Sequence, residues 1–487
     1  MNSYLTDLIS NAPIMVVIVT VLLAMVVEAT RRTHPTATYY ISLIGLVIAS
    51  VFTVTNLTIE GESFGGMVRH GGYANFFGTL FCITALMTVI LARNYFERQN
   101  YHRGEFYILL LFATIGMMLI ASANDLIILF LGIELMSVCL YVLAGFIRMK
   151  ERSNEAALKY FLLGAFATGF LLYGIALIYG AVGTTNILLM RNVFVVVSTN
   201  MLFVIGAGLL MIGLAFKVAA VPFHMWAPDV YEGAPTPVTA FMSTGAKAAA
   251  FAAFITVFIR TFDFLGGRVN ELIAVLAAAS MIVGNVVAIA QTNIKRMLAY
   301  SSIAHAGYML CGIAAGTIDG QVGVMFYIVA YAMMNLGAFA IISIVEGEDD
   351  KNLSLDDYTG FSRHQPLLAL LMAVFMFALA GVPPFAGFFG KYYVFFSAIK
   401  AQMTWLAIIG VLASLVSAYY YLRIVVLMYF REGKAKIWEA PPDGRAGIPL
   451  GEVKPSIVVL AVVIICAVVV LALGLFPSLI TQTAQRF

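Results

Sequence analysis

The feature that most constrains this chain is a series of long apolar segments that recurs from one end to the other. A membrane-spanning helix needs roughly 20 mostly apolar residues, and about fourteen segments meet that requirement. Of the 487 residues, 62% are hydrophobic and 11% are charged, whereas soluble domains are about 45–50% apolar and about 25% charged. We therefore predict an all-α polytopic membrane protein with these spans: 13–30, 37–56, 71–92, 106–122, 126–147, 156–181, 201–231, 236–259, 271–291, 298–317, 322–345, 366–397, 404–430 and 456–478.

The distribution of basic residues predicts how these helices cross the membrane. If both termini lie outside, the inner loops carry about three times as many Lys and Arg residues as the outer loops, as the positive-inside rule expects. An even number of helices with both termini on the outer side satisfies that asymmetry. The formal net charge of +3 is too balanced to indicate a nucleic-acid partner.

The sequence contains no pattern typical of a resident cofactor. The four cysteines lie far apart inside apolar runs, without the spacing of an iron–sulfur, zinc or disulfide framework. No glycine-rich nucleotide motif is present, and two histidines at depth do not make a convincing haem pair. We expect no cofactor and no metal site in this chain.

Five charged side chains lie deep inside apolar segments: Glu134, Lys217, Lys247, Lys391 and Arg423. Each charge at the centre of a spanning helix opposes insertion by about 2.5–3.5 kcal/mol. Arg423 lies near a helix end, where it could equally extend to the interface. Three lysines against one acid exceed what structural ion pairs require, so we interpret this set as a site whose members change charge.

Two of the segments cannot be continuous helices. Residues 201–231 and 366–397 would be about 45–48 Å long, well beyond a hydrocarbon core of about 30 Å. Pro222 interrupts the first, and Pro383 and Pro384 interrupt the second, each close to one of the lysines. Broken helices beside an intramembrane charge are typical of ion pathways.

The deep polar residues recur at an offset of about 171–176 residues, which indicates an internal repeat. The residues that share this offset are Glu134 and His305, Lys217 and Lys391, and Lys247 and Arg423. The proline breaks are offset by 161–162 residues, so the match is one of organisation and not of residue-by-residue identity. These residues assign helices 4–8 and 9–13 to two units, and because each unit has five helices, the second is inverted in the membrane. The predicted organisation is a three-helix segment at 1–105, repeats at 106–260 and 261–431, and a loop with a final helix at 432–487.

Three segments carry a resemblance to a known family: PFHMWAPDVYEGAPTPVTAF, QTNIKRMLAYSSIAHAGY and LAGVPPFAGFFGKYYVF. Together they resemble the antiporter-like subunits of respiratory complex I, the NADH:quinone oxidoreductase, over nearly the whole chain. The DVYEGAPTP segment and a lysine on helix 12 favour the N type over the M type. The sequence also ends after helix 14, without the lateral helix of the L type.

The resemblance implies one proton channel and specific roles for the deep residues. The implied relay consists of Glu134 paired with Lys217, Lys247 at the centre, and Lys391 towards the outer half-channel. His224, His305 and Arg423 are accessory candidates, and His305 could equally be a hydrogen-bonded packing residue. An imidazole near Pro222 suits a relay because histidine titrates near neutral pH.

The resemblance also implies that the energy for transport comes from elsewhere. The chain would be a non-redox membrane subunit of a translocase in a bacterial inner membrane. FMN, iron–sulfur clusters and quinone would belong to partner subunits, and subunits M, K and J and the lateral helix of L would be its neighbours.

Two other functions remain open. A subunit of a multi-subunit cation/proton antiporter of the Mrp type would share the lysines and the broken helices and could exchange sodium. A membrane enzyme acting on lipid would need a metal or nucleophile cluster at the interface, and the sequence shows none.

Overall fold

The computed structural model describes residues 2–30, 35–192, 200–347, 351–431 and 455–487. Within these residues, 13 helices are long and apolar enough to cross a membrane, and the shorter apolar helix α18 (Pro366–Ala380) is continued by α19 (Ala386–Lys400). With that broken helix, they account for the predicted fourteen spans. The prediction of an all-α polytopic fold is confirmed.

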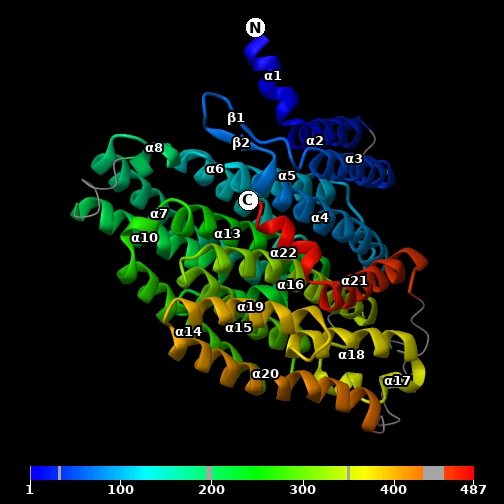
Figure 1. The fold of residues 1–487 in the computed structure, drawn as a ribbon. Coiled ribbons are helices and arrows are strands. Elements are labelled where there is room, and N and C mark those ends of the chain that lie inside the picture. The colour runs from blue at the N-terminus through cyan, green and yellow to red at the C-terminus, as the bar shows by residue number, and fades with distance from the viewer. Residues whose placement is uncertain (1, 31–34, 193–199, 348–350, 432–454) are drawn as a thin grey trace.

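The elements follow one another along the chain in three groups (Figure 1). The N-terminal group is α1 (Asn2–Ser10), α2 (Ala12–Thr30), α3 (Pro35–Thr55), β1 (Gly61–Ser63), β2 (Val68–His70) and α4 (Gly72–Arg98). The first repeat is α5 (Glu105–Ser122), α6 (Leu126–Ala144), α7 (Glu151–Val182), α8 (Ile187–Asn192), α10 (Met201–Val218), α11 (Trp226–Gly233), α12 (Thr236–Phe241), η1 (Met242–Ala246), α13 (Lys247–Phe254) and η2 (Ile255–Ile259). The second repeat is η3 (Asp263–Leu265), α14 (Gly267–Ile289), α15 (Ile294–Ala314), α16 (Ile318–Val345), η5 (Leu355–Tyr358), α17 (Phe361–His364), α18, α19 and α20 (Thr404–Phe430). Two C-terminal helices, α21 (Ile457–Leu475) and α22 (Ser478–Ala484), follow the repeats.

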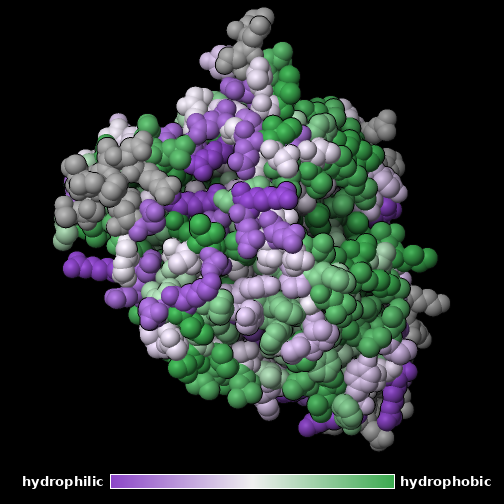
Figure 2. Space-filling view, viewed as in Figure 1, coloured by the Kyte–Doolittle hydropathy of each residue, from purple (hydrophilic) through white to green (hydrophobic). Residues whose placement is uncertain are grey.

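The helix bundle has two polar ends. The terminal face carries α1, the antiparallel β1–β2 hairpin and α22, and the opposite face carries α11, the start of α12 and the end of α16. Figure 2 shows hydrophilic residues gathered around the hairpin and α22, with hydrophobic residues over the flanks. The sequence analysis did not predict α1, the hairpin or α22, because all three are too short to be recognised by a membrane-length hydropathy window.

Large apolar side chains cover the outside of the bundle. Phe166 on α7 and Leu415 on α20 are 74% and 72% exposed, and Phe161, Phe170 and Val411 are similarly open. Apolar surface of this extent does not face water in a stable protein. It is the surface that contacts lipid or neighbouring membrane subunits.

Both predicted helix breaks are present and have the same backbone construction. Helix α10 ends before Ala219, which has φ 58°, and α18 ends before Gly381, which has φ 89°. The next amide in each break bonds back to the helix end, from Ala220 to Ala215 at 2.9 Å and from Val382 to Phe377 at 3.1 Å. A left-handed residue with these returning bonds is a helix C-cap that satisfies the last carbonyl groups. A cis X–Pro bond follows in each break.

The inverted repeat is confirmed by matching backbone bridges. Asp125 bridges to Asn186 at the start of α6, and Asn293 bridges to Ser354 at the start of α15. Each of these first residues also caps its helix with its side chain. A constant shift of about 168 residues relates the two bridges, and they lie at opposite ends of the bundle, as an inverted repeat requires.

The polar residues that share the offset do not occupy equivalent backbone positions in the two repeats. The bridges place Ser302 at the position of Glu134, and His305 at the position of Ser137. The paired breaks are related by a shift of about 162 residues, which places Lys391 at the position of Asp229. The prediction matched polar residues by type, whereas the turns and caps of the backbone fix the actual register. Lys217 therefore precedes its break and Lys391 follows the other.

Candidate functional site

Three lysines lie buried in the bundle interior, and none of them has a carboxylate partner within the described residues. Lys217, Lys247 and Lys391 are 7%, 3% and 6% exposed. Hydroxyl and carbonyl oxygens, which are neutral acceptors, surround their amino groups. Burying a charge in hydrocarbon is costly unless it is compensated, so this set is a costly polar feature of the bundle interior.

Lys217, at the end of α10, donates to side chains of α6. Its Nζ atom lies 2.7 Å from the Ser137 hydroxyl and 3.4 Å from the Tyr141 hydroxyl. The same amino group lies 5.7 Å from the centroid of the Tyr141 ring, within the range of a cation–π contact. Lys217 thus joins the first broken helix to the helix that carries Glu134.

Glu134 has a different partner from the one that the resemblance implies. Its carboxylate accepts a 2.7 Å hydrogen bond from Thr168 on α7, and within the described part of the chain it forms no ion pair with Lys217. Tyr141 interacts with both Thr168 and Ser137, so hydroxyl groups connect the carboxylate to the lysine. The predicted pair is therefore linked through hydroxyl groups and not by direct contact.

Lys247 begins α13, immediately after the π-helical segment η1. Its Nζ atom donates to the Ser302 backbone carbonyl at 2.8 Å and makes a short contact with the Ser302 hydroxyl on α15. The amino group lies 6.0 Å from the Tyr331 ring centroid. π-helical segments widen a helix locally and are frequent at functional sites. The first repeat and the second repeat meet at this lysine.

His305 occupies the centre of a tyrosine cluster between Lys247 and Lys391. Its ring nitrogens lie 2.8 Å from the Tyr327 hydroxyl and 3.0 Å from the Tyr421 hydroxyl. The ring of Tyr331 packs 5.0 Å away, and Tyr421 also contacts Ser301. Because both nitrogens are hydrogen-bonded, His305 is a packed residue that also links the hydroxyl groups of Tyr327 and Tyr421.

Lys391, on α19, reaches back across the second break. Its Nζ atom donates to the carbonyls of Leu379 and Ala380 at 3.2 and 2.9 Å and to the Ser414 hydroxyl at 2.8 Å. These three acceptors match the three N–H groups of an ammonium ion. The two carbonyls end α18, where the helix dipole favours a cation. Lys391 also lies 4.9 Å from the Tyr308 ring centroid.

The two remaining accessory candidates, His224 and Arg423, lie apart from the three buried lysines. His224 lies in the first break, half-buried, and its Nδ1 atom has no partner within the described residues. Arg423 donates to the carbonyl of Gln291 at 3.4 Å, beyond the end of α14. That contact indicates a cap on a neighbouring helix, and neither residue joins the hydrogen bonds of the three lysines.

A network of ion pairs joins the repeats on the opposite face. Asp229 on α11 contacts Lys159 on α7 at 2.8 Å and Arg296 on α15 at 2.7 Å. Arg296 also contacts Glu232 at 2.9 Å. The side chains are 23–42% exposed, so each pair is worth only about 0.2–1 kcal/mol.

We expect Asp229→Asn to lower the free energy of unfolding by about 1 kcal/mol at low salt, because it weakens two ion pairs at once. High salt should reduce the difference between the variant and the parent, since exposed charges are screened. Thermal unfolding of the purified protein in detergent, at low and high salt, measures both effects. A loss that is independent of salt would contradict this account.

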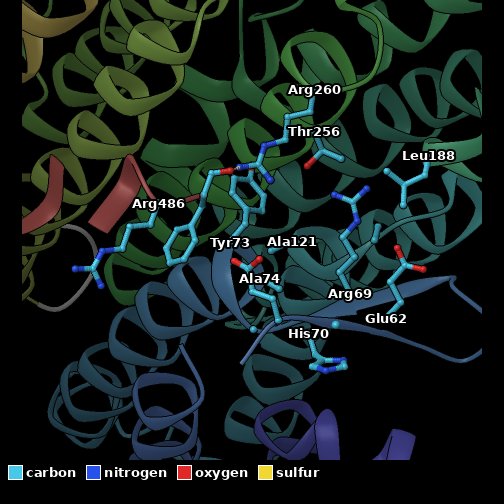
Figure 3. Close-up of a pocket in the computed structure, with 15 residues that line it drawn as sticks. Glu62, Arg69, His70, Tyr73, Ala74, Ala121, Leu188, Thr256, Arg260 and Arg486 are labelled. Carbon is cyan, nitrogen blue, oxygen red and sulfur yellow. Dashed lines mark hydrogen bonds between the residues drawn. The ribbon is translucent and has the colours of Figure 1, made fainter. Parts of the chain in front are cut away.

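The terminal face contains a cavity of about 400 Å³ lined by charged side chains (Figure 3). Arg260 from η2 lies 3.9 Å from the centroid of the Tyr73 ring and donates to Gln321 and to the backbone oxygen of Phe487. Burial, together with the charge of Arg260, lowers the pKa of the Arg69 guanidinium from its ordinary value. No cluster of three or more His, Cys, Asp or Glu side chains within the described residues could hold a metal ion.

Comparison with known proteins identifies the family. Residues 123–417 match the family described as "NADH:quinone oxidoreductase/Mrp antiporter, TM". NADH-quinone oxidoreductase subunit N of Trichlorobacter lovleyi is 48% identical over 453 residues, which cover 92% of this chain and 90% of that protein. The chain belongs to the NADH-quinone oxidoreductase subunit N family. Subunit N 1 of Chloroherpeton thalassium, another family member, is 46% identical over 485 residues and covers 99% of this chain and 98% of its own length.

Solved structures place the subunit N family among complex I and its relatives. A chain of respiratory complex I from Thermus thermophilus with bound Aureothin is 35% identical, with a TM-score of 0.81 over 96% of this chain and 98% of that one. A chain of the Mrp complex from Dietzia sp. has a TM-score of 0.83 over 98% of this chain and 96% of that one at 22% identity. The second likeness shows the shared fold alone.

The sequence analysis found the charged residues of the site but not the groups that connect them. Ser137, Ser302, Tyr327 and Tyr421 were not predicted. Serine and tyrosine are common in membrane helices, and the type of residue alone does not indicate its partner. The only available signal was the spacing of polar residues along one helix face in YSSIAHAGY.

Proposed function

We propose that this chain moves protons across a bacterial inner membrane as a non-redox subunit of a proton-translocating NADH:quinone oxidoreductase. The observation that carries the proposal is the set of three buried lysines, Lys217, Lys247 and Lys391, two of which lie beside the helix breaks, with the half-buried Glu134 near Lys217. Serine, threonine, tyrosine and histidine side chains lie beside its members. Groups of this kind can donate and accept a proton in turn.

Within this proposal the residues of this chain bind, hold and release protons, and the energy comes from partner subunits. FMN, iron–sulfur clusters and quinone would be bound there, and subunits M, K and J and the lateral helix of L would contact this chain. The terminal face would be periplasmic, because the opposite orientation would reverse the bias of basic residues.

We expect Glu134→Gln to assemble normally and to lower proton pumping at least about tenfold, because a positioned proton-transfer group typically contributes more than that. The amide keeps an acceptor for Thr168 but can no longer carry the charge that acts on Lys217. Pumping is measured in proteoliposomes with NADH and quinone, after native gels confirm assembly. Unchanged pumping in the assembled variant would remove Glu134 from the relay.

The same preparation separates this function from that of a cation/proton antiporter. We expect flavin and iron–sulfur clusters to copurify with the native complex, and NADH-driven pumping to proceed without sodium. Strict sodium-dependent exchange, with no copurifying flavin or iron–sulfur subunits, would favour the antiporter.

A further inference from the structure

A buried carboxylate outside the predicted relay lies at the opposite face. Glu346 follows the last residue of α16 and is 2% exposed. Tyr95 on α4 donates to its Oε1 atom at 3.1 Å, and Thr236, the first residue of α12, makes a short contact with Oε2. Its direct partners in the described part of the chain are thus two hydroxyl groups.

The charged and titratable groups around Glu346 bind other atoms. Arg98 donates to the backbone carbonyls of Ile344 and Ser343, and its Nε atom has no partner within the described residues. Lys295 on α15 donates to the carbonyl of Ala234 at 2.8 Å. The buried hydroxyl of Tyr358 also lacks a partner there. Glu346 therefore lies among polar groups but forms no direct ion pair within the described part of the chain.

The start of α12 leads from this carboxylate to the central lysine. Thr236, Thr239, Ser243 and Lys247 follow one another at intervals of three or four residues, so they lie on one side of the helix. All four are buried. The two ends of this stripe contact α16, at Glu346 and at Tyr331, so the stripe runs along α16.

Helix α16, which faces α12, carries buried polar groups without partners in the described structure at the level of Lys247. Asn335 on α16 and Lys247 are each eleven residues from the contact between Glu346 and Thr236, or about 16 Å along their helices. Both amide atoms of Asn335 and the hydroxyl of Tyr331 are buried without a partner in the described structure. Buried polar groups are normally satisfied, and water is the usual partner where protein groups do not supply one.

We propose that Glu346 is the proton-loading residue of the opposite face and supplies Lys247 along the stripe of hydroxyl groups on α12. The inference rests on the proposed function and adds a residue to it. A proton leaves a hydronium ion in the aqueous phase and binds the Glu346 carboxylate. Thr239 and Ser243 donate to the carbonyls of Tyr231 and Ala240 and not to each other, so water bridges the stripe in this proposal. The proton then passes by exchange of hydrogen bonds through that water, along Thr236, Thr239 and Ser243, to the neutral amine of Lys247, with no change of redox state.

The test compares Glu346→Gln with Glu97→Gln in the assembled complex, because Glu97 lies on α4 at the surface, pairs with Arg93 and is 46% exposed. Glutamine keeps the size and the hydrogen-bonding capacity of the side chain but cannot load a proton, so we expect pumping to fall about tenfold near pH 8. The deficit should shrink as the pH of the uptake side falls to about pH 6, because a higher proton concentration makes it easier for protons to enter the stripe without the help of Glu346. Glu97→Gln makes the same chemical change at an exposed carboxylate and should pump like the parent.

Further variants separate failure of this inference from failure of the proposed function. Glu346→Asp should restore most of the pumping, which a purely structural role in packing would not predict. If Glu346→Gln assembles and pumps fully while Lys247→Met does not, the inference is wrong and the proposed function stands. Full pumping by Lys247→Met overturns the function itself. If Glu346→Gln does not assemble, the double variant Thr239→Val, Ser243→Ala decides, and normal pumping in it overturns the inference.

Discussion

Replacing Lys391 by alanine is expected to leave the complex assembled and to lower NADH-driven proton pumping about tenfold or more. The amino group of Lys391 is the only cation among the described residues that contacts the carbonyls at the end of α18, and it also binds Ser414 on α20. Without it, the second broken helix has no group that can hold a proton between the tyrosine cluster and the terminal face. Quinone-coupled turnover should fall with pumping if the two are tightly coupled.

Lys400→Ala is the matched control, because Lys400 lies on the same helix but pairs with Asp319 at the surface and is 53% exposed. It should assemble and pump like the parent. If Lys391→Ala failed to accumulate while Lys400→Ala accumulated, the buried lysine would have a structural role. Lys217→Ala should resemble Lys391→Ala, since its contacts with Ser137 and Tyr141 are likewise made by one amino group.

Gly474→Val is expected to destabilise the fold more than any surface substitution, because α21 packs directly against the second break at this residue. A Cβ atom at Gly474 would lie 1.9 Å from the Pro384 carbonyl oxygen and 2.9 Å from the Ala386 amide nitrogen. Backbone atoms cannot move aside as a flexible side chain can. Overpacking of this kind costs about 1–3 kcal/mol or more. The midpoint of thermal unfolding in detergent and the yield of assembled complex measure the effect.

Gly208→Val on α10 makes the same substitution where a Cβ atom would meet nothing within 4 Å. Valine forms helix at least as well as glycine, so we expect this control to be neutral or slightly stabilising. Equal losses in both variants would show that valine acts through helix propensity. A loss confined to Gly474→Val assigns the effect to the contact with the break.

The sequence predicts the architecture well because hydropathy and proline each act locally. The length of a span is set by the bilayer, and Pro222, Pro383 and Pro384 cannot continue a straight helix. Both breaks lie where these residues place them. The inverted relation of the repeats follows from the odd number of helices in each unit and is also correct.

The sequence does not predict the internal register or the hydroxyl groups that join the lysines. Matching Glu134 with His305 used similarity of side chains, but the bridges at Asp125 and Asn293 set a different alignment. Nor can a pattern show that Thr168 binds Glu134, since a helical threonine can bond a carbonyl of its own helix or a group on a neighbouring helix. Only the packing of helices distant in sequence selects between these partners.

The two repeats carry opposite charges at matching positions after their breaks, and this difference bears on the direction of proton movement. Two half-channels related by an inverted repeat would treat a proton from either side alike if their side chains also matched. Here one half carries Lys391, a cation, where the other carries Asp229, an anion. The backbone is symmetric while its charges are opposed, so a proton that enters from one membrane side meets a buried lysine where a proton from the other side meets a carboxylate held by Lys159 and Arg296.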